Sequence, residues 1–292
     1  MKGVCSRHIS VVHSLQCFYI ITEKGYIMNR SFLQGALAVL VLFGLFSFFE
    51  SLPKKNEKEE IFKERIVSKF NYAYRVFIPE SWDGRVSWPV ILFLHGKRER
   101  GEDNSSQTEV GLGRILKENS RGLPIPAIVV FPQCSENEWW TDSFVQRKVL
   151  AALFQAVKEF NGDTSKIYLT GISMGGYGVW SMAANYPNIF AAIAPVCGGI
   201  RSHREIPAVS VGDSADPYRA VAEKIKHIPV YIFHGRQDKV IPFSESLKME
   251  RALRKLGGRV SFNEYTFSGH DVWDSAYASE NFNFWMMRQR KE

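Results

Sequence analysis

The chain has 292 residues, of which 45% are hydrophobic, and this is enough to build one large α/β domain. Its net charge of +7 is spread along the chain, with no basic block interleaved with aromatic residues. That pattern indicates a solvated surface rather than a nucleic-acid interface. The four cysteines form neither a Cys-x-x-Cys motif nor a cluster with histidines, which argues against a structural metal site.

Residues 31–49 form an uncharged apolar run, close in length to the ~20 residues that a membrane-spanning helix needs. A core helix would show a polar face, which this run lacks. The Met-Asn-Arg before it is typical of an export signal, so we expect a signal anchor or signal peptide at residues 28–50 and an over-long gene prediction at residues 1–27. A small-x-small cleavage pattern is missing, which favours an uncleaved anchor over a cleaved peptide. Lysines after the run leave its orientation open, because they favour a cytoplasmic location for the rest of the chain.

Residues 51–65 are rich in lysine and glutamate, so they predict a charged linker that is too polar to pack. The globular domain would occupy residues 60–292. It would open with two strands near residues 61–67 and 72–78 that form an antiparallel pair.

The apolar run at residues 88–94 predicts a strand buried on both faces. It ends at His95-Gly96, and we expect the next backbone N–H, that of Lys97, to point at the edge of the sheet as a donor to an oxyanion. A second buried strand, residues 127–131, leads into a loop with Trp139 and Trp140. These two rings either stack on a sugar or phenolic ring or pack the loop onto the domain.

The central motif of the sequence is Gly-x-Ser-x-Gly at residues 171–175, with Ser173 as its serine. An apolar strand precedes it and a helix with apolar residues on one face follows it. A strand, a sharp turn and a helix are the setting of a nucleophile elbow, in which the serine backbone is strained and the flanking glycines avoid a clash. The hydroxyl of Ser173 would then project above the sheet beside the backbone N–H of Met174, the other expected oxyanion donor.

A serine needs a base and an acid, and in this setting they follow it along the chain in the order acid, then histidine. Asp238 lies in the loop after the strand that ends at His234-Gly235, and His270 lies in the loop after the next strand. Loops at the carboxyl ends of parallel strands meet at one edge, so Ser173, Asp238 and His270 can converge. The roles would be nucleophile, orienting acid and general base.

Other residues in these segments have competing interpretations. Asp271 and Asp274 are rival acids, but they are too close in sequence to His270 to orient it as readily from a separate loop. His95 and His234 each precede a glycine at a strand end and do not follow the acid, so we interpret them as structural. Cys134 and Cys197 follow predicted strands and could approach each other, although two buried free thiols are the favoured interpretation.

With these motifs in this order, residues 66–292 resemble the α/β-hydrolase superfamily, and more narrowly the bacterial esterases described as peptidase-like, phospholipase/carboxylesterase-like or feruloyl-esterase-like. The resemblance rests on the stretches 93–96, 99–104, 131–134, 171–180 and 268–273 and on the Asp238 loop. It implies a mostly parallel central sheet with helices on both faces. It also implies export to the periplasm or outside the cell, here with a tether to the membrane through residues 31–49. Relatives usually carry small residues after His-Gly, whereas this chain has Lys97-Arg98.

The sequence therefore predicts a serine carboxylesterase (EC 3.1.1) that acts on small or carbohydrate-linked esters through an acyl-enzyme, with no cofactor or metal. The resemblance implies feruloyl or acetyl groups on polysaccharide, and Trp139, Trp140 and Trp273 are compatible with such substrates. A peptidase of the prolyl-oligopeptidase-like kind and an acyltransferase use the same triad and remain alternatives. A non-catalytic binding protein on this scaffold is a third, which the ordered Ser, Asp and His argue against. The sequence leaves the oligomeric state open.

Overall fold

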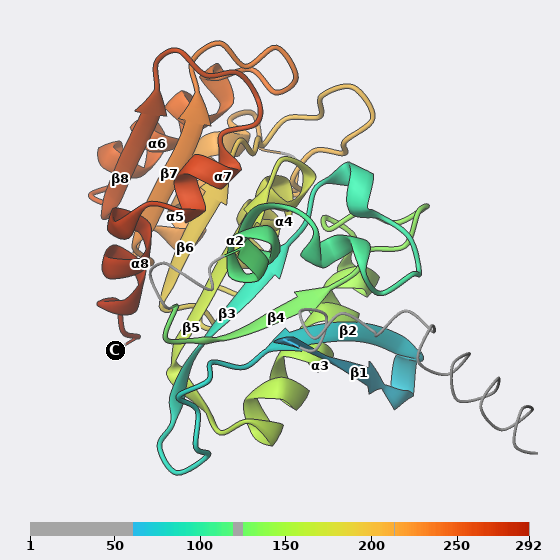
Figure 1. The fold of residues 1–292 in the computed structure, drawn as a ribbon. Helices are drawn as coiled ribbons and strands as arrows, with labels where there is room; N and C mark the ends of the chain where they lie inside the picture. The colour runs from blue at the N-terminus through green and yellow to red at the C-terminus, as the bar shows by residue number, and fades with distance from the viewer. Residues whose placement is uncertain (1–60, 119–124, 213, 292) are drawn as a thin grey trace, which may run out of the picture. The chain divides into compact units, whose positions relative to one another are not determined.

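A computed structural model describes residues 61–118, 125–212 and 214–291 of the chain (Figure 1). The predicted gene extension at residues 1–27, the signal segment at 28–50 and most of the linker lie outside these ranges. Within them, none of the helices has the length and apolar character needed to cross a membrane. The linker prediction was too long at its carboxyl end, because residues 62–65 already belong to a strand.

The domain is built on one sheet of eight strands in the order β1-β2-β4-β3-β5-β6-β7-β8 (Figure 1). The pairs β1–β2 and β2–β4 are antiparallel, and the other pairs are parallel. The strands are β1 (Phe62–Val67), β2 (Tyr72–Phe77), β3 (Trp88–Leu94), β4 (Ile128–Pro132), β5 (Gly162–Ile172), β6 (Ala192–Val196), β7 (Val230–Gly235) and β8 (Val260–Tyr265). This confirms the predicted mostly parallel α/β sheet and its antiparallel lead-in.

Helices cover both faces of this sheet, as the α/β-hydrolase prediction requires. One face packs against α3 (Ser143–Glu159), α4 (Met174–Asn185), α5 (Pro217–Ile225) and α6 (Ser244–Lys255). The other packs against α2 (Gly111–Glu118), α7 (Trp273–Tyr277) and α8 (Glu280–Met287). Short 3-10 turns lie at Ser68–Phe70, Lys97–Glu99 and Ser106–Thr108.

Side chains along β3 alternate between the two hydrophobic cores, one on each face of the sheet. Val90, Leu92 and Leu94 point into the cluster under α3 and α4, whereas Ile91 and Phe93 point into the cluster under α2 and α7. All five side chains are fully buried. Since both faces of the strand are covered, its sequence is continuously apolar rather than alternating.

From the sequence alone, a single final helix is expected over roughly residues 274–290. The structure has two shorter helices, α7 and α8, separated at Ala278-Ser279. The backbone of Ser279 is extended (φ −75°, ψ 127°), and this residue is the N-cap of α8. The Ser279 side chain makes no capping hydrogen bond to the helix, so the extended backbone of this residue is what separates the two helices.

The crossing between β3 and α4 is unusually close. A Cβ atom built on Gly175 would lie 2.0 Å from the carbonyl oxygen of Leu94 and 2.8 Å from that of His95. A Cβ on Gly171 would lie 2.7 Å from the same Leu94 oxygen. The glycines of the motif are therefore required by backbone-to-backbone packing.

His95 holds the loop that follows β3. Its Nε2 accepts a hydrogen bond from the backbone N–H of Cys134 (2.9 Å), and its Nδ1–H donates to the carbonyl of Gly96 (2.6 Å). Trp140 packs edge-on against the ring, with centroids 4.9 Å apart. Burial lowers the pKa of His95 from 6.5 to about 4, so the ring is neutral at pH 7 and ties two loops together.

We expect Gly175→Ala to lower the free energy of unfolding by about 3 kcal/mol or more, because the clashing atoms are backbone and cannot rotate away. In a domain of this size that corresponds to a fall in Tm of roughly 6–12 °C. Gly269→Ala is the matched control, because a Cβ there meets nothing within 4 Å. Equal melting temperatures of the two variants would contradict the close crossing.

His95 also predicts a loss of stability in mild acid. The unfolded state takes up a proton near pH 6.5 and the folded state only near pH 4, so stability falls between these values, by about 2 kcal/mol at pH 5. The free energy of unfolding should be measured in urea at pH 7 and at pH 5 for the wild type and for His95→Asn. The decrease from pH 7 to pH 5 should be about 2 kcal/mol smaller in the variant, whatever its stability at pH 7. An identical loss in both proteins would show that His95 is not the responsible group.

Candidate active site

Ser173 sits in the strained turn that the motif predicts. Its backbone has φ 52° and ψ −113°, and it is the N-cap of α4 directly after β5. This left-handed conformation is uncommon for a residue with a side chain and costs about 1–3 kcal/mol. The backbone N–H of Ser173 donates to Val196 of β6 (2.9 Å), and its carbonyl accepts from Tyr177 (3.2 Å), so both neighbouring elements hold the turn in place.

The structure brings together the three residues that the sequence singles out. The Ser173 hydroxyl donates to Nε2 of His270 across 2.9 Å, and Nδ1–H of His270 donates to Oδ2 of Asp238 across 2.7 Å. These residues follow β5, β7 and β8 at the carboxyl edge of the sheet, although they lie up to 97 positions apart in sequence. The arrangement allows the imidazole to take the hydroxyl proton as the serine oxygen attacks a carbonyl carbon.

The carboxylate of Asp238 is fully buried and accepts four hydrogen bonds. Its Oδ1 accepts from the backbone N–H groups of Val240 (2.7 Å) and Ile241 (2.9 Å), and its Oδ2 accepts from His270 and His234. Burial raises the pKa of Asp238, but the hydrogen bonds from His234, His270 and Ile241 outweigh it and hold the pKa well below its usual value. The group is therefore a fixed negative charge beside His270.

His234 is a site residue whose role the sequence did not reveal. It is fully buried, and its Nδ1 lies 2.7 Å from the hydroxyl of Ser246 in α6. Its Nε2 lies 3.1 Å from Oδ2 of Asp238 and from the carbonyl of Ile241. Because both of those atoms only accept, Nε2 carries the proton and Ser246 donates to Nδ1. The short spacing His-Gly-x-x-Asp was the available signal for this contact.

The two expected oxyanion donors each begin a helical segment, one directly after β5 and the other just beyond β3. Met174 is the first residue of α4, so its N–H is among those without a partner inside the helix. Lys97 begins the 3-10 turn directly after Gly96, and its ammonium pairs with Glu205 in the loop between β6 and α5. The unusual lysine therefore has an acidic partner from a distant part of the chain, and only its backbone N–H is available for the expected role.

The three tryptophans considered for substrate contact have different settings. Trp273 lies edge-on to the ring of His270, with centroids 5.4 Å apart, and it is partly exposed. Trp139 is also partly exposed, and the guanidinium of Arg100 covers its ring at 4.6 Å. Trp140 is only 1% exposed and donates from Nε1 to the carbonyl of His95. Stacking on a substrate is therefore wrong for Trp140, because its ring is used to pack the loop.

The irregular loop between β6 and α5 is anchored by a buried carboxylate. Glu245 of α6 accepts from the backbone N–H groups of Ile200 (2.8 Å) and Arg201 (3.1 Å) and from the hydroxyl of Tyr218 (2.5 Å). Hydrogen bonds to a carboxylate are among the stronger ones. The loop is thereby held beside the serine at its start, while its tip reaches Lys97 through Glu205.

The remaining candidates fall outside the Ser173–His270–Asp238 chain. Asp274 pairs with Arg114 of α2 (3.2 Å). Cys134 and Cys197 are free and buried, which confirms the favoured interpretation, and they belong to cores on opposite faces of the sheet.

Among the described residues, one group has the proximity of a metal site. Ligand atoms of Cys197, His234 and Asp238 lie within 4.8 Å of one another. Their atoms are already engaged, since the Cys197 thiol donates to the carbonyl of His270 (3.0 Å) and Asp238 accepts from both histidines. Burial also raises the pKa of the Cys197 thiol, which disfavours a thiolate. The donor set does not fit a cation.

Two curated proteins are similar to part of this chain. An uncharacterized secreted protein of Arthroderma benhamiae is 25% identical over 68% of this chain and 23% of its own length. A bifunctional acetylxylan esterase/xylanase of Neocallimastix patriciarum is 25% identical over 54% of this chain and 20% of its own length. The chain thus spans about a fifth to a quarter of the length of these relatives.

Comparison with solved structures and with family profiles gives the same picture. The crystal structure of a thermostable esterase matches with a TM-score of 0.63 and 29% identity, over 79% of this chain and 64% of that chain. Residues 133–278, half of the chain, match the profile of the dienelactone hydrolase family, and this range contains Ser173, Asp238 and His270. The chain therefore belongs to the dienelactone hydrolase family.

Proposed function

We propose that this protein hydrolyses carboxylic esters through a covalent acyl-enzyme on Ser173. The observation that carries the proposal is the unbroken pair of hydrogen bonds from Ser173 to His270 (2.9 Å) and from His270 to Asp238 (2.7 Å). Family membership and the esterase neighbours support a hydrolase of esters. The buried, four-fold hydrogen-bonded Asp238 supports its role as the orienting acid.

In the proposed reaction, Nε2 of His270 takes the Ser173 proton as the serine oxygen attacks the ester carbonyl. The N–H groups of Met174 and Lys97 stabilise the oxyanion, and each such donor is typically worth about 2.7–4 kcal/mol in the transition state. His270 then protonates the leaving alcohol, and the acyl group stays on Ser173. Water, deprotonated by the same histidine, releases the acid and restores the serine.

We further propose that the ester is linked to carbohydrate. The similar esterase of Neocallimastix patriciarum acts on acetylxylan according to its name, which supports an acyl group on a polysaccharide. Trp273 beside His270 is partly exposed and offers aromatic surface to a sugar or phenolic ring. Trp139 is partly exposed as well, but Arg100 already covers its ring, so Trp273 is the stronger candidate for this contact.

Export is proposed on two grounds. Residues 31–49 carry no charge and are long enough for a signal segment, and a relative is described as secreted. We propose that residues 28–50 direct the domain of residues 60–292 to the periplasm or the exterior.

Ser173→Ala is expected to abolish hydrolysis of short-chain nitrophenyl esters, with kcat/KM at least 10³-fold lower, because no acyl-enzyme can form. The stability of the variant should be close to that of the wild type. Peptide substrates assayed in parallel distinguish an esterase from a peptidase. A variant with more than a tenth of wild-type activity would exclude Ser173 as the nucleophile.

Asp238→Asn is expected to lower kcat about 10³- to 10⁴-fold, because an amide in this place turns a donor towards His270 and favours the wrong tautomer. Its Oδ1 can still accept from Val240 and Ile241, so folding should be preserved.

The matched control is Asp271→Asn, at the exposed rival acid next to His270. It should change kcat less than about threefold, since Asp271 is not the acid that His270 contacts. If Asp271→Asn lowered kcat by 10³-fold or more while Asp238→Asn left it nearly unchanged, the catalytic acid would be Asp271.

A further inference from the structure

A hollow opens at the carboxyl edge of the sheet, and its lining does not include the triad residues. It has a volume of about 490 Å³, and the residues that line it include Phe70, Tyr72, Glu102, Asn104, Glu138 and Lys148. They come from the turn between β1 and β2, the first residue of β2, the loops after β3 and β4, and the first half of α3. This size lies within the range of small-molecule sites, about 300–1,000 Å³.

The position of the hollow follows from the sheet order. Tyr74 of β2 pairs with Pro132 at the end of β4, so Tyr72 lies just beyond that carboxyl end. From β5, which carries Ser173, the sheet runs through β3 and β4 to β2. Three steps of ~4.8 Å place the hollow roughly 14 Å along the edge from the serine. Trp139, between β4 and α3, also lies on this edge.

One side of the hollow is apolar. Ile66 is 50% exposed, and Phe70 packs edge-on against Phe144, which is itself 50% exposed. Aromatic and aliphatic surface open to solvent at the rim of a pocket is suited to the C–H face of a ring.

The other side is polar and carries one uncompensated negative charge, that of Glu102. Lys148 and Glu138 are paired (2.7 Å) and mostly buried, which cancels one charge of each sign. Glu102 is exposed and has no hydrogen-bond partner within the described part of the chain. Behind this wall, Tyr72 Oη and Asn104 Nδ2 are buried without a protein partner among the described residues, and unpaired buried polar atoms are unfavourable.

We propose that this hollow binds a neutral sugar unit of the substrate, several residues away from the esterified one. A pyranose has a C–H face for Phe70 and Ile66, and each of its hydroxyls can both donate and accept. The polar wall offers both hydrogen-bond donors and acceptors, and Glu102 is a free acceptor for a sugar hydroxyl. Its negative charge also disfavours an anionic ligand. The inference rests on the proposed function, since it names the distal part of that substrate.

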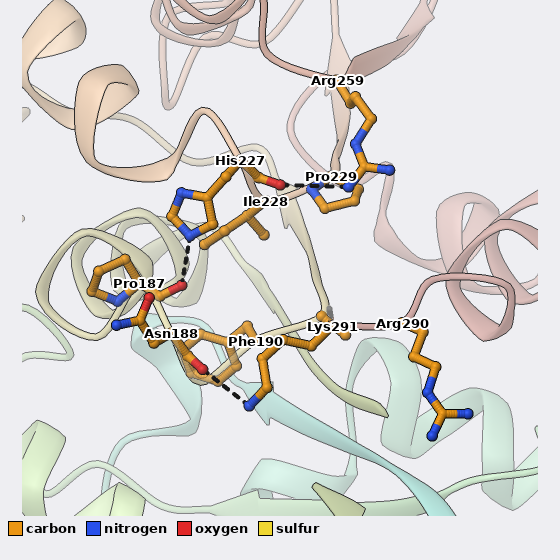
Figure 2. Close-up of a pocket in the computed structure, with 10 residues that line it drawn as sticks. Pro187, Asn188, Phe190, His227, Ile228, Pro229, Arg259, Arg290 and Lys291 are labelled. Atoms are coloured by element: carbon orange, nitrogen blue, oxygen red, sulfur yellow. Dashed lines mark hydrogen bonds between the residues drawn. The ribbon is translucent and has the colours of Figure 1, made fainter. Parts of the chain in front are cut away.

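The pocket at the opposite edge of the sheet has a different character (Figure 2). It has a volume of about 370 Å³ and is lined by Arg259, Arg290 and Lys291 around Phe190 and Ile228. These residues lie before the amino ends of β6 and β7 and next to β8, or in the tail after α8. It is basic, and it faces away from the carboxyl edge that carries Ser173, so it serves as the control site.

Binding is tested with the inactive Ser173→Ala protein, full length, titrated calorimetrically with unesterified xylotetraose and cellotetraose. We expect one of these to bind, with affinity reduced about tenfold or more by Glu102→Ala, because a carboxylate hydrogen bond is lost. Glu102→Gln should restore most of the affinity, since a neutral sugar needs the acceptor rather than the charge. Arg259→Ala in the opposite pocket should have no effect.

A kinetic measurement completes the test. In the active enzyme, the ratio of kcat/KM for an acylated tetrasaccharide to that for an acylated monosaccharide should fall about tenfold in Glu102→Ala.

Absence of oligosaccharide binding, binding unaffected by Glu102→Ala, or binding lost in Arg259→Ala would each overturn the inference. If nitrophenyl esters are hydrolysed but chain length has no effect, only the inference fails. If oligosaccharide binds at Glu102 but no ester is turned over, the proposed function fails and the sugar site stands.

Discussion

The close approach of α4 to the carbonyl of Leu94 is the constraint on which the rest of the site depends. A Cβ at Gly175 would lie 2.0 Å from that oxygen, so only a glycine lets the helix begin directly above β3. This places Ser173 between β5 and α4 with a left-handed backbone, at a cost that the buried sheet must offset. The hydroxyl is consequently held above the sheet edge, 2.9 Å from His270, rather than lying along a regular strand or helix.

A second constraint is the burial of one negative charge. A carboxylate in the interior is costly unless hydrogen bonds surround it, and Asp238 has two backbone donors and two histidines. His234 is fixed in turn by a hydrogen bond to Ser246, so a continuous series of hydrogen bonds runs from α6 through Asp238 to the imidazole of His270. In this series of hydrogen bonds, the partners of each side chain allow only one placement of its protons. Nε2 of His270 therefore carries no proton and can accept the hydrogen bond from Ser173.

Much of this could be predicted from the sequence because its signals are local. The glycines around Ser173 and the strands that end at Gly235 and Tyr265 fixed the order of the three residues along one sheet edge. Contacts between distant segments had no such signal. Lys97 meets Glu205 across 108 positions, Trp140 closes over His95 across 45, and neither spacing carries a pattern. The break between α7 and α8 was missed because it depends on the extended backbone of one residue, Ser279, whose side chain makes no capping hydrogen bond.

The most direct test of the account is to look for the acyl group itself. A rapid mix of the protein with nitrophenyl acetate, acid quench and intact mass measurement should show a population heavier by one acetyl group, and peptide mapping should place that group on Ser173. The acetylated fraction should disappear as the substrate is consumed. Turnover without an acylated serine, or acetyl on another residue, would contradict the proposed geometry of catalysis.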